Sequence, residues 1–188
     1  MSEFNFFLNN NNKLTISLAA RTSVPATTYY IIGDLDGQGK SISDNEILIF
    51  EGSVLRGAYH INEDYSVTID KNLADELNYS ITKANPSMPP RDPCLIRTGF
   101  VADLNHDGYI ELVYACANRI FVTSYNPNEQ TGSRFVNWPR PVNLIDADLA
   151  ETLSVADLDG NGFLDLAAET RRVSNNQSAV SFFLSFSE

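Results

Sequence analysis

Residues 101–115 read VADLNHDGYIELVYA, and residues 155–169 read VADLDGNGFLDLAAE. Both stretches begin with Val-Ala-Asp-Leu, continue through a polar loop with a glycine at its end, and finish in an apolar run. A more divergent copy, IGDLDGQGKSISDNEILIF, occupies residues 32–50. Repetition of one short unit along a chain is the signature of a repeat architecture. The sequence therefore predicts several similar structural units in succession.

The spacing of the three copies is uneven. The interval from Asp34 to Asp103, the first Asp residues of the first two copies, is longer than the interval from Asp103 to Asp157. The extra length predicts insertions in the first unit. Two stretches are candidates: residues 41–45 inside the first loop and the Pro-rich residues 85–93 after it.

The segments around each loop are short, apolar and rich in β-branched and aromatic residues, as strands are. Each unit reads strand, polar loop, strand, turn and strand, and residues 67–70 add an outer strand to the first. A four-stranded antiparallel sheet repeated at this period is typical of a propeller blade. We therefore predict an all-β fold of about three such sheets, as part of a larger or oligomeric β-propeller. The expected strands are 29–32, 95–102 and 153–156 before the loops, 46–50, 112–117 and 164–168 after them, and 54–61, 119–125 and 179–186 as third strands.

The beginning of the chain fits the same register. The segment FNFFL at residues 4–8 resembles VSFFL at residues 180–184, so the chain is expected to begin at a third strand, with residues 13–18 as the outer strand. Closed propellers have about four to eight blades. We therefore expect further blades or self-association to complete the ring. The predicted units are a partial blade at 1–26, blades at 27–93 and 94–150, and a blade without its outer strand at 151–188.

The loops carry oxygen ligands at regular positions. Counted from the first Asp, side chains with oxygen atoms stand at positions 1, 3, 5 and 9, and glycine at position 6 permits a sharp bend. Position 7 would contribute its backbone carbonyl. Such a cluster of oxygens suits a hard cation such as Ca²⁺.

Two other interpretations of the loops were compared with this one. An EF-hand closes its calcium shell with a Glu at position 12, where this chain has Tyr114 and Ala168, and its flanks are helices. The EF-hand is therefore excluded. Asp-Gly hairpin turns without metal are the remaining alternative. Three such loops at blade spacing, each with several converging carboxylates, favour the metal.

The second and third copies resemble the FG-GAP or VCBS repeats of integrin α-subunit-like propellers. In that family, Asp-x-Asp-x-Asp-Gly-x-x-Asp loops bind calcium between the first two strands of a blade. In the first loop Gln38 replaces the acid at position 5 and Ile42 stands at position 9, so Glu46 or Asp44 would take the ninth role across an insertion. The resemblance implies the ligands Asp103, Asn105, Asp107, Tyr109 and Glu111 in the second loop, Asp157, Asp159, Asn161, Phe163 and Asp165 in the third, and Asp34, Asp36, Gln38 and Glu46 in a weaker first site.

Composition narrows the function. Asp and Glu number 24 against 13 Lys and Arg, a formal net charge of −11, which disfavours nucleic acid as a partner. No apolar run reaches the length of a membrane span, and no hydrolase, phosphate-loop or dinucleotide motif occurs. The resemblance implies a non-catalytic, calcium-binding module for a protein or carbohydrate ligand, extracellular or at the cell surface. The alternative is an accessory propeller of a larger secreted enzyme such as a polysaccharide lyase or phospholipase.

The cysteines, a histidine and the single tryptophan gave further expectations. Antiparallel pairing centred near residues 106 and 107 would place Cys116 opposite residue 97, a few positions from Cys94, which predicts two buried thiols. His106, at position 4 of its loop, should point outward. Trp138, in a Pro-flanked loop, either packs between blades or offers a ring to a ligand.

Overall fold

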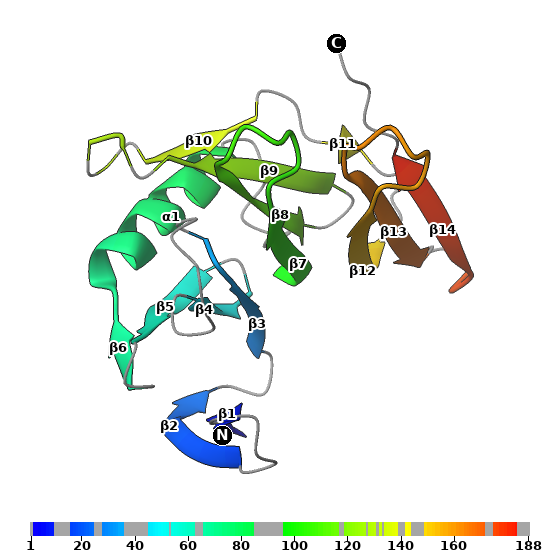
Figure 1. Cartoon of the computed structure of the whole chain (residues 1–188). Helices are drawn as coiled ribbons and strands as arrows, with labels where there is room; N and C mark the ends of the chain where they lie inside the picture. The colour runs from blue at the N-terminus through cyan, green and yellow to red at the C-terminus, as the bar shows by residue number, and fades with distance from the viewer. Residues whose placement is uncertain are drawn as a thin grey trace.

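The computed structural model describes residues 2–9, 16–24, 28–35, 45–52, 54–62, 66–84, 96–116, 119–126, 128–130, 132, 134–138, 142–143, 149–171 and 175–183. These residues form antiparallel sheets that follow one another along the chain, with one helix between the first two blade-like sheets (Figure 1). The predicted all-β fold is confirmed, and the sheets are consistent with propeller blades. Within the described parts of the chain, no helix is long and apolar enough to cross a membrane.

Three sheets contain the repeated unit. The first has the order β3 (Thr28–Gly33), β4 (Glu46–Glu51), β5 (Val54–Ile61) and β6 (Val67–Ile69). The second consists of β7 (Ile96–Ala102), β8 (Ile110–Cys116) and β9 (Arg119–Tyr125), with β10 (Phe135–Asn137) and β11 (Val142–Asn143) both paired to β9. The third has β12 (Leu149–Ala156), β13 (Asp165–Arg171) and β14 (Ser178–Phe183). A separate hairpin joins β1 (Ser2–Asn9) to β2 (Ile16–Val24).

A helix accounts for the uneven spacing of the repeats. The connection from β6 to β7, residues 70–95, is more than twice as long as residues 138–148, which connect β10 to β12. The difference between these two connections matches the extra length of the first repeat. The helix α1 (Lys71–Ala84), with 14 residues, fills most of the longer connection. The sequence analysis missed this helix, and its two candidate insertions lie, apart from Asn45, outside the described residues.

The helix follows from local chemistry. Asp70 accepts a hydrogen bond from the Leu73 amide at 2.9 Å, which caps the first turn. Leu73, Leu77 and Ile81 recur at every fourth position and are all buried in a core that the first and second sheets share. One face of α1 is therefore apolar, as a helix that packs against a sheet requires.

Asn78 of α1 replaces part of an outer strand. In the second sheet, β11 pairs with β9 at Ile120. The equivalent residue of the first sheet is Leu55, and there the Asn78 side chain accepts from the Leu55 amide at 2.8 Å and donates to its carbonyl at 2.9 Å. A primary amide can imitate a backbone peptide group in this way because it carries both a donor and an acceptor.

The helix also holds the second sheet. Arg134, just before β10, donates to both carboxylate oxygens of Glu76 at 2.8–3.2 Å, and it also donates to the Tyr125 hydroxyl at 2.9 Å. One turn further along, Ser80 donates to the Asn137 side chain at 3.0 Å, and Asn137 donates back to the Ser80 carbonyl at 2.9 Å. The helix α1 thus lies between β5 and β10 and links the outer edges of two sheets (Figure 1).

The inner strands carry further contacts between sheets, because β7 touches both β3 and β12. The Tyr29 hydroxyl bonds the amide and carbonyl of Gly99 at 3.2 and 3.3 Å, and the Leu153 amide donates to Thr98 at 3.0 Å. A Cβ on Gly99 would lie 2.7 Å from the Ile31 side chain and 2.6 Å from the Val113 carbonyl oxygen. Glycine at this position therefore allows two sheets to approach closely.

Cys116 corrects the expectation of two buried thiols. The residue is fully buried and belongs to a disulfide; the only other cysteine of the sequence, Cys94, lies outside the described residues. The register near the loop is as predicted, with Ala102 opposite Glu111. An irregularity between Ile96 and Gly99 then places Cys116 opposite residue 96 instead of residue 97. The residue opposite Cys116 is therefore one position closer to Cys94 in the sequence than expected.

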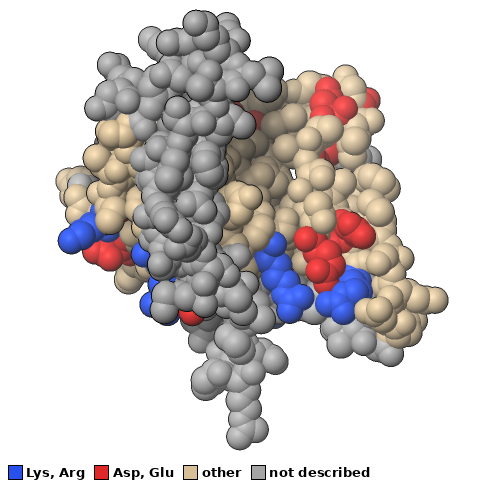
Figure 2. Space-filling model, turned by 90° about the horizontal axis from the view of Figure 1, so that it is seen from below, with Lys and Arg blue, Asp and Glu red and all other residues tan. Residues whose placement is uncertain are grey.

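The ends of the sheets differ in charge. The acidic loops after β7 and β12 lie at the upper side of Figure 1. On the face seen from below in Figure 2, basic and acidic side chains lie next to one another. At the strand ends opposite the loops, Glu151 pairs with Arg171 at 2.7 Å and with Arg97 at 3.8 Å. Carboxylates at this end are therefore compensated by arginines, whereas the loop end gathers acids.

Candidate metal centre

The third loop brings three carboxylates together. Ligand oxygens of Asp157, Asp159 and Asp165 all lie within 4.8 Å of one another. Asp165 starts β13 and is 1% exposed, whereas the other two are exposed on the loop. Like charges this close repel unless a cation or protons compensate them. Among the described residues, this is the one group of three metal-ligating side chains whose ligand atoms lie within 4.8 Å of one another.

Both described loops fold through the same hydrogen bonds. Position 1 accepts from the glycine amide at position 6, Gly108 to Asp103 at 3.1 Å and Gly162 to Asp157 at 3.0 Å. Position 5 accepts from the amide at position 7, which is Tyr109 or Phe163, at 2.8 Å in each loop. The side chains thus shape the turn that carries them. That the position-7 carbonyls bind metal stays a prediction.

Two positions in each loop have left-handed backbone conformations. Position 6 has φ values of 86° at Gly108 and 90° at Gly162, as a glycine that permits a sharp bend requires. Position 4 also has positive φ, 76° at Gly160 and 57° at His106. His106 is exposed as expected, and its ring stacks on Phe163 of the next loop at 5.5 Å between centroids. The second and third loops are therefore in direct contact.

The acid at position 9 is buried and occupies the same place in all three sheets. Glu46, Glu111 and Asp165 are at most 3% exposed. Each accepts a hydrogen bond from the amide at position 2 of its own loop, at 2.7 Å, 2.8 Å and 2.8 Å respectively. Glu46 is therefore the structural equivalent of Glu111 and Asp165 despite the insertion in the first loop. Asp44, the other candidate, lies outside the described residues.

Electrostatics in the second loop also favour a cation. Burial raises the pKa of Glu111, and the nearby charges of Asp107 and Asp103 act in the same direction, against hydrogen bonds from Leu104 and Ser124. The Oδ1 atom of Asp103 is buried and has no hydrogen-bond partner. A buried carboxylate oxygen without a partner is costly, and a bound cation would supply one. The residues present therefore fit Ca²⁺, which takes six to eight oxygen ligands.

The remaining predicted ligands have these positions. Asn105 donates to Asp107 at 2.9 Å, and Asn161 donates to Asp159 at 3.1 Å, so both amides lie within their carboxylate clusters. Asp34 follows β3 at the start of the first loop. Asp36 and Gln38 lie outside the described residues.

The sequence analysis missed two neighbours of the position-9 acids, His60 and Ser124, and a third residue behind them, Trp138. His60 lies 2.9 Å from Glu46 through Nδ1, and Ser124 donates to Glu111 at 2.9 Å from the equivalent position of its sheet. Trp138 in turn donates its indole N–H to Ser124 at 2.8 Å and is 40% exposed. The sequence offered one signal for His60 and Ser124, their similar separation from the position-9 acid: 14 positions between Glu46 and His60, and 13 between Glu111 and Ser124.

Residues 103–168 match the family model of the FG-GAP-like repeat. This segment of the chain is similar to an FG-GAP-like repeat. The match runs from the position-1 Asp of the second loop to the strand after the third loop, so the repeat contains both described acidic clusters. The resemblance stated from the sequence is thereby confirmed for this segment. Comparison with curated proteins gives no match.

Proposed function

We propose that this chain is a calcium-binding β-propeller module that binds a protein or carbohydrate partner and performs no catalysis itself. The observation that carries the proposal is the cluster of Asp157, Asp159 and Asp165, whose oxygens lie within 4.8 Å of one another. The buried Asp103 Oδ1 without a partner supports a second site one repeat earlier. FG-GAP-like repeats are typically non-catalytic, which supports a binding role for residues 103–168.

Calcium would act mainly on stability. The position-9 acids lie at the start of the second strand of each sheet, and the position-1 acids follow the first strand. A cation between them would join two strands and two ends of one loop, and it would offset the repulsion among the carboxylates. Binding to the folded state alone raises stability by about 2.7 kcal/mol at a hundredfold excess over Kd.

The disulfide supports an extracellular or cell-surface location. Cys116 is disulfide-bonded and fully buried. Disulfides persist in oxidising environments and are rare where thiols are kept reduced. Weak calcium sites are typical of extracellular modules, where the ion is abundant.

The test is thermal unfolding with calcium and with a chelator. Asp159 is exposed and hydrogen-bonds within its loop to Asn161, so Asp159→Ala should leave the calcium-free protein folded and reduce the calcium-dependent gain. Asp75→Ala is the matched control, because it removes a carboxylate from α1, away from the loops. An equal melting temperature in calcium and chelator would refute the proposal.

A further inference from the structure

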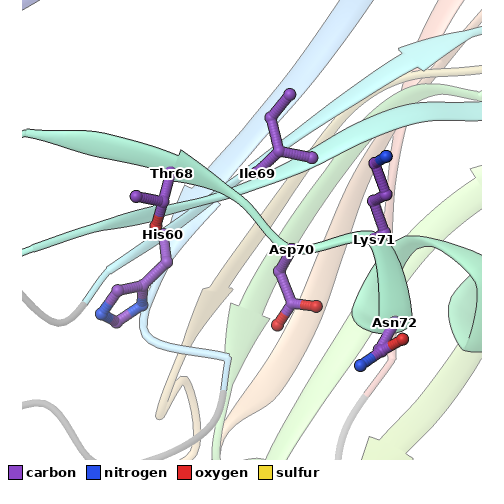
Figure 3. A pocket seen from close by; sticks show the side chains of 6 residues that line it. All are labelled: His60, Thr68, Ile69, Asp70, Lys71 and Asn72. Carbon is purple, nitrogen blue, oxygen red and sulfur yellow. The ribbon is translucent and has the colours of Figure 1, made fainter.

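A pocket of about 490 Å³ lies at the outer edge of the first sheet (Figure 3). Its volume falls within the range of roughly 300–1,000 Å³ typical of small-molecule sites. The lining is mainly polar and comes from β5, β6 and the start of α1. It consists of His60, Thr68, Ile69, Asp70, Lys71 and Asn72.

Three polar side chains of the lining lie on one side of the ribbon. In Figure 3 the side chains of His60, Asp70 and Asn72 point the same way, whereas Lys71 and Ile69 point to the other side of the ribbon. These three groups are an imidazole, a carboxylate and a primary amide. Together they offer both hydrogen-bond donors and acceptors on one side of the pocket.

Half of the lining residues belong to a part of the chain that the repeat itself does not need. Asp70, Lys71 and Asn72 lie in the helical connection, whose counterpart after the second sheet is less than half as long. His60 takes the place that Ser124 has in the second sheet. Segments added to a rigid scaffold are where binding residues are usually found. The pocket is therefore a feature of the first sheet and not of the repeat.

Two of the polar groups are held in place by the fold. The Asp70 carboxylate accepts from the Leu73 amide at 2.9 Å, and the Asp70 amide donates to the Ala58 carbonyl at 2.8 Å. The His60 ring is fixed through Nδ1 by Glu46 at 2.9 Å. Because Glu46 occupies Nδ1, Nε2 is the ring atom available to a ligand. Groups ordered before binding lose less entropy when a ligand arrives.

The chemistry of the lining favours a neutral ligand with several hydroxyl groups. The Asp70 carboxylate lies on this side of the pocket, and the chain as a whole has a net charge of −11, so both disfavour an anionic ligand. A carboxylate next to an amide can accept from and donate to adjacent hydroxyls. An apolar ligand would leave these polar groups desolvated without partners.

We propose that this pocket binds a neutral sugar, with Asp70 and Asn72 bonding adjacent hydroxyls and His60 Nε2 bonding a third. The proposal rests on the binding role put forward above and names its ligand class and its site. Because His60 is bonded to Glu46, sugar binding is linked to the position-9 acid of the first loop.

The test uses the full chain and a panel of methyl glucopyranoside, galactopyranoside and mannopyranoside at millimolar concentration, measured by calorimetry and ligand-observed NMR. At least one sugar should bind saturably. Asp70→Asn keeps a residue that caps helices well and removes the carboxylate, so affinity should fall about tenfold with the fold retained. Asn72→Ala and His60→Ser should also weaken binding, and Ser is the residue that the second sheet has at this place.

Asp75→Asn is the matched control, since it changes a carboxylate of the same helix to an amide outside the pocket. It should bind as the wild type does. Absence of binding by every sugar of the panel overturns the proposal, as does wild-type affinity in all three pocket variants. Asn72→Ala keeps the test decisive if another variant fails to fold, because Asn72 is exposed and alanine favours the helix. Calcium-dependent melting without sugar binding would contradict this inference alone, whereas sugar binding without calcium-dependent melting would contradict the metal proposal alone.

Discussion

Replacement of Asn78 by alanine tests the idea that α1 takes the place of an outer strand. The side chain satisfies both the amide and the carbonyl of Leu55, at 2.8 and 2.9 Å. Leu55 is 3% exposed, so water has little access to the groups that the mutation would leave without a partner. The second sheet satisfies the equivalent residue, Ile120, through pairing with β11.

The expected cost follows from these two groups. A buried donor or acceptor left unsatisfied costs about 1–3 kcal/mol. Two such groups in a partly buried place give a loss of about 2–4 kcal/mol in the free energy of unfolding. For a chain of this length the melting temperature should fall by roughly 5–10 °C. Asn78→Asp should also destabilise, because it keeps the acceptor for the Leu55 amide and loses the donor for the carbonyl.

Urea unfolding measures the change, and hydrogen exchange of the Leu55 amide locates it. Tyr79→Ala is the control, since Tyr79 is the next residue of the helix and is 64% exposed. It should change stability by no more than about 0.5 kcal/mol. If Asn78→Ala is as stable as Tyr79→Ala, the helix does not replace a strand in the way described.

Three further predictions concern the loops and the helix. Calcium should bind the first loop more weakly than the third, because an insertion of four residues separates Asp34 from its position-9 acid Glu46, and ordering a longer loop costs more entropy; calorimetry that finds equal affinities would contradict this ranking. In calcium-free buffer, the pKa of Glu111 is raised in the folded protein. Its contribution to the free energy of unfolding is therefore greatest below pH 4.5, the ordinary pKa of the group, and is lost as pH rises through the folded-state pKa. Glu111→Gln should therefore reduce the change of the free energy of unfolding with pH in this range, as measured by urea unfolding at several pH values. An unchanged pH dependence would count against a buried, charged Glu111. Burial acts to raise the pKa of Glu76, but hydrogen bonds and charge from Arg134 outweigh it and leave the pKa lowered. The contribution of Glu76 to the free energy of unfolding is therefore present above pH 4.5 and is lost as pH falls through the folded-state pKa. Arg134→Lys cannot repeat the bidentate contact and should cost about 1–2 kcal/mol at neutral pH by thermal unfolding, whereas wild-type stability would exclude that contact as a source of stability.

The position-9 acids show both the reach and the limit of sequence reasoning. Glu111 and Asp165 could be assigned to position 9 by counting from the first Asp of the loop. The first loop contains an insertion, so counting left two candidates, Glu46 and Asp44. Only the hydrogen bond from the Leu35 amide shows that Glu46 has the equivalent place.

The repeated loops, their flanking strands and the register around them could be predicted from the chain alone, because each depends on residues close together in it. Alternation, turn glycines and loop spacing are local features, and they predicted the pairing of Ala102 with Glu111. The helix that replaces part of an outer strand and joins two sheets became visible only in the folded molecule. Its contacts connect residues 23 positions apart for Asn78 and Leu55, and 57 apart for Ser80 and Asn137. The amide of Asn78 could serve a turn, a helix surface or a strand edge, and its partner is selected only when packing of Leu73, Leu77 and Ile81 brings the helix onto the sheet.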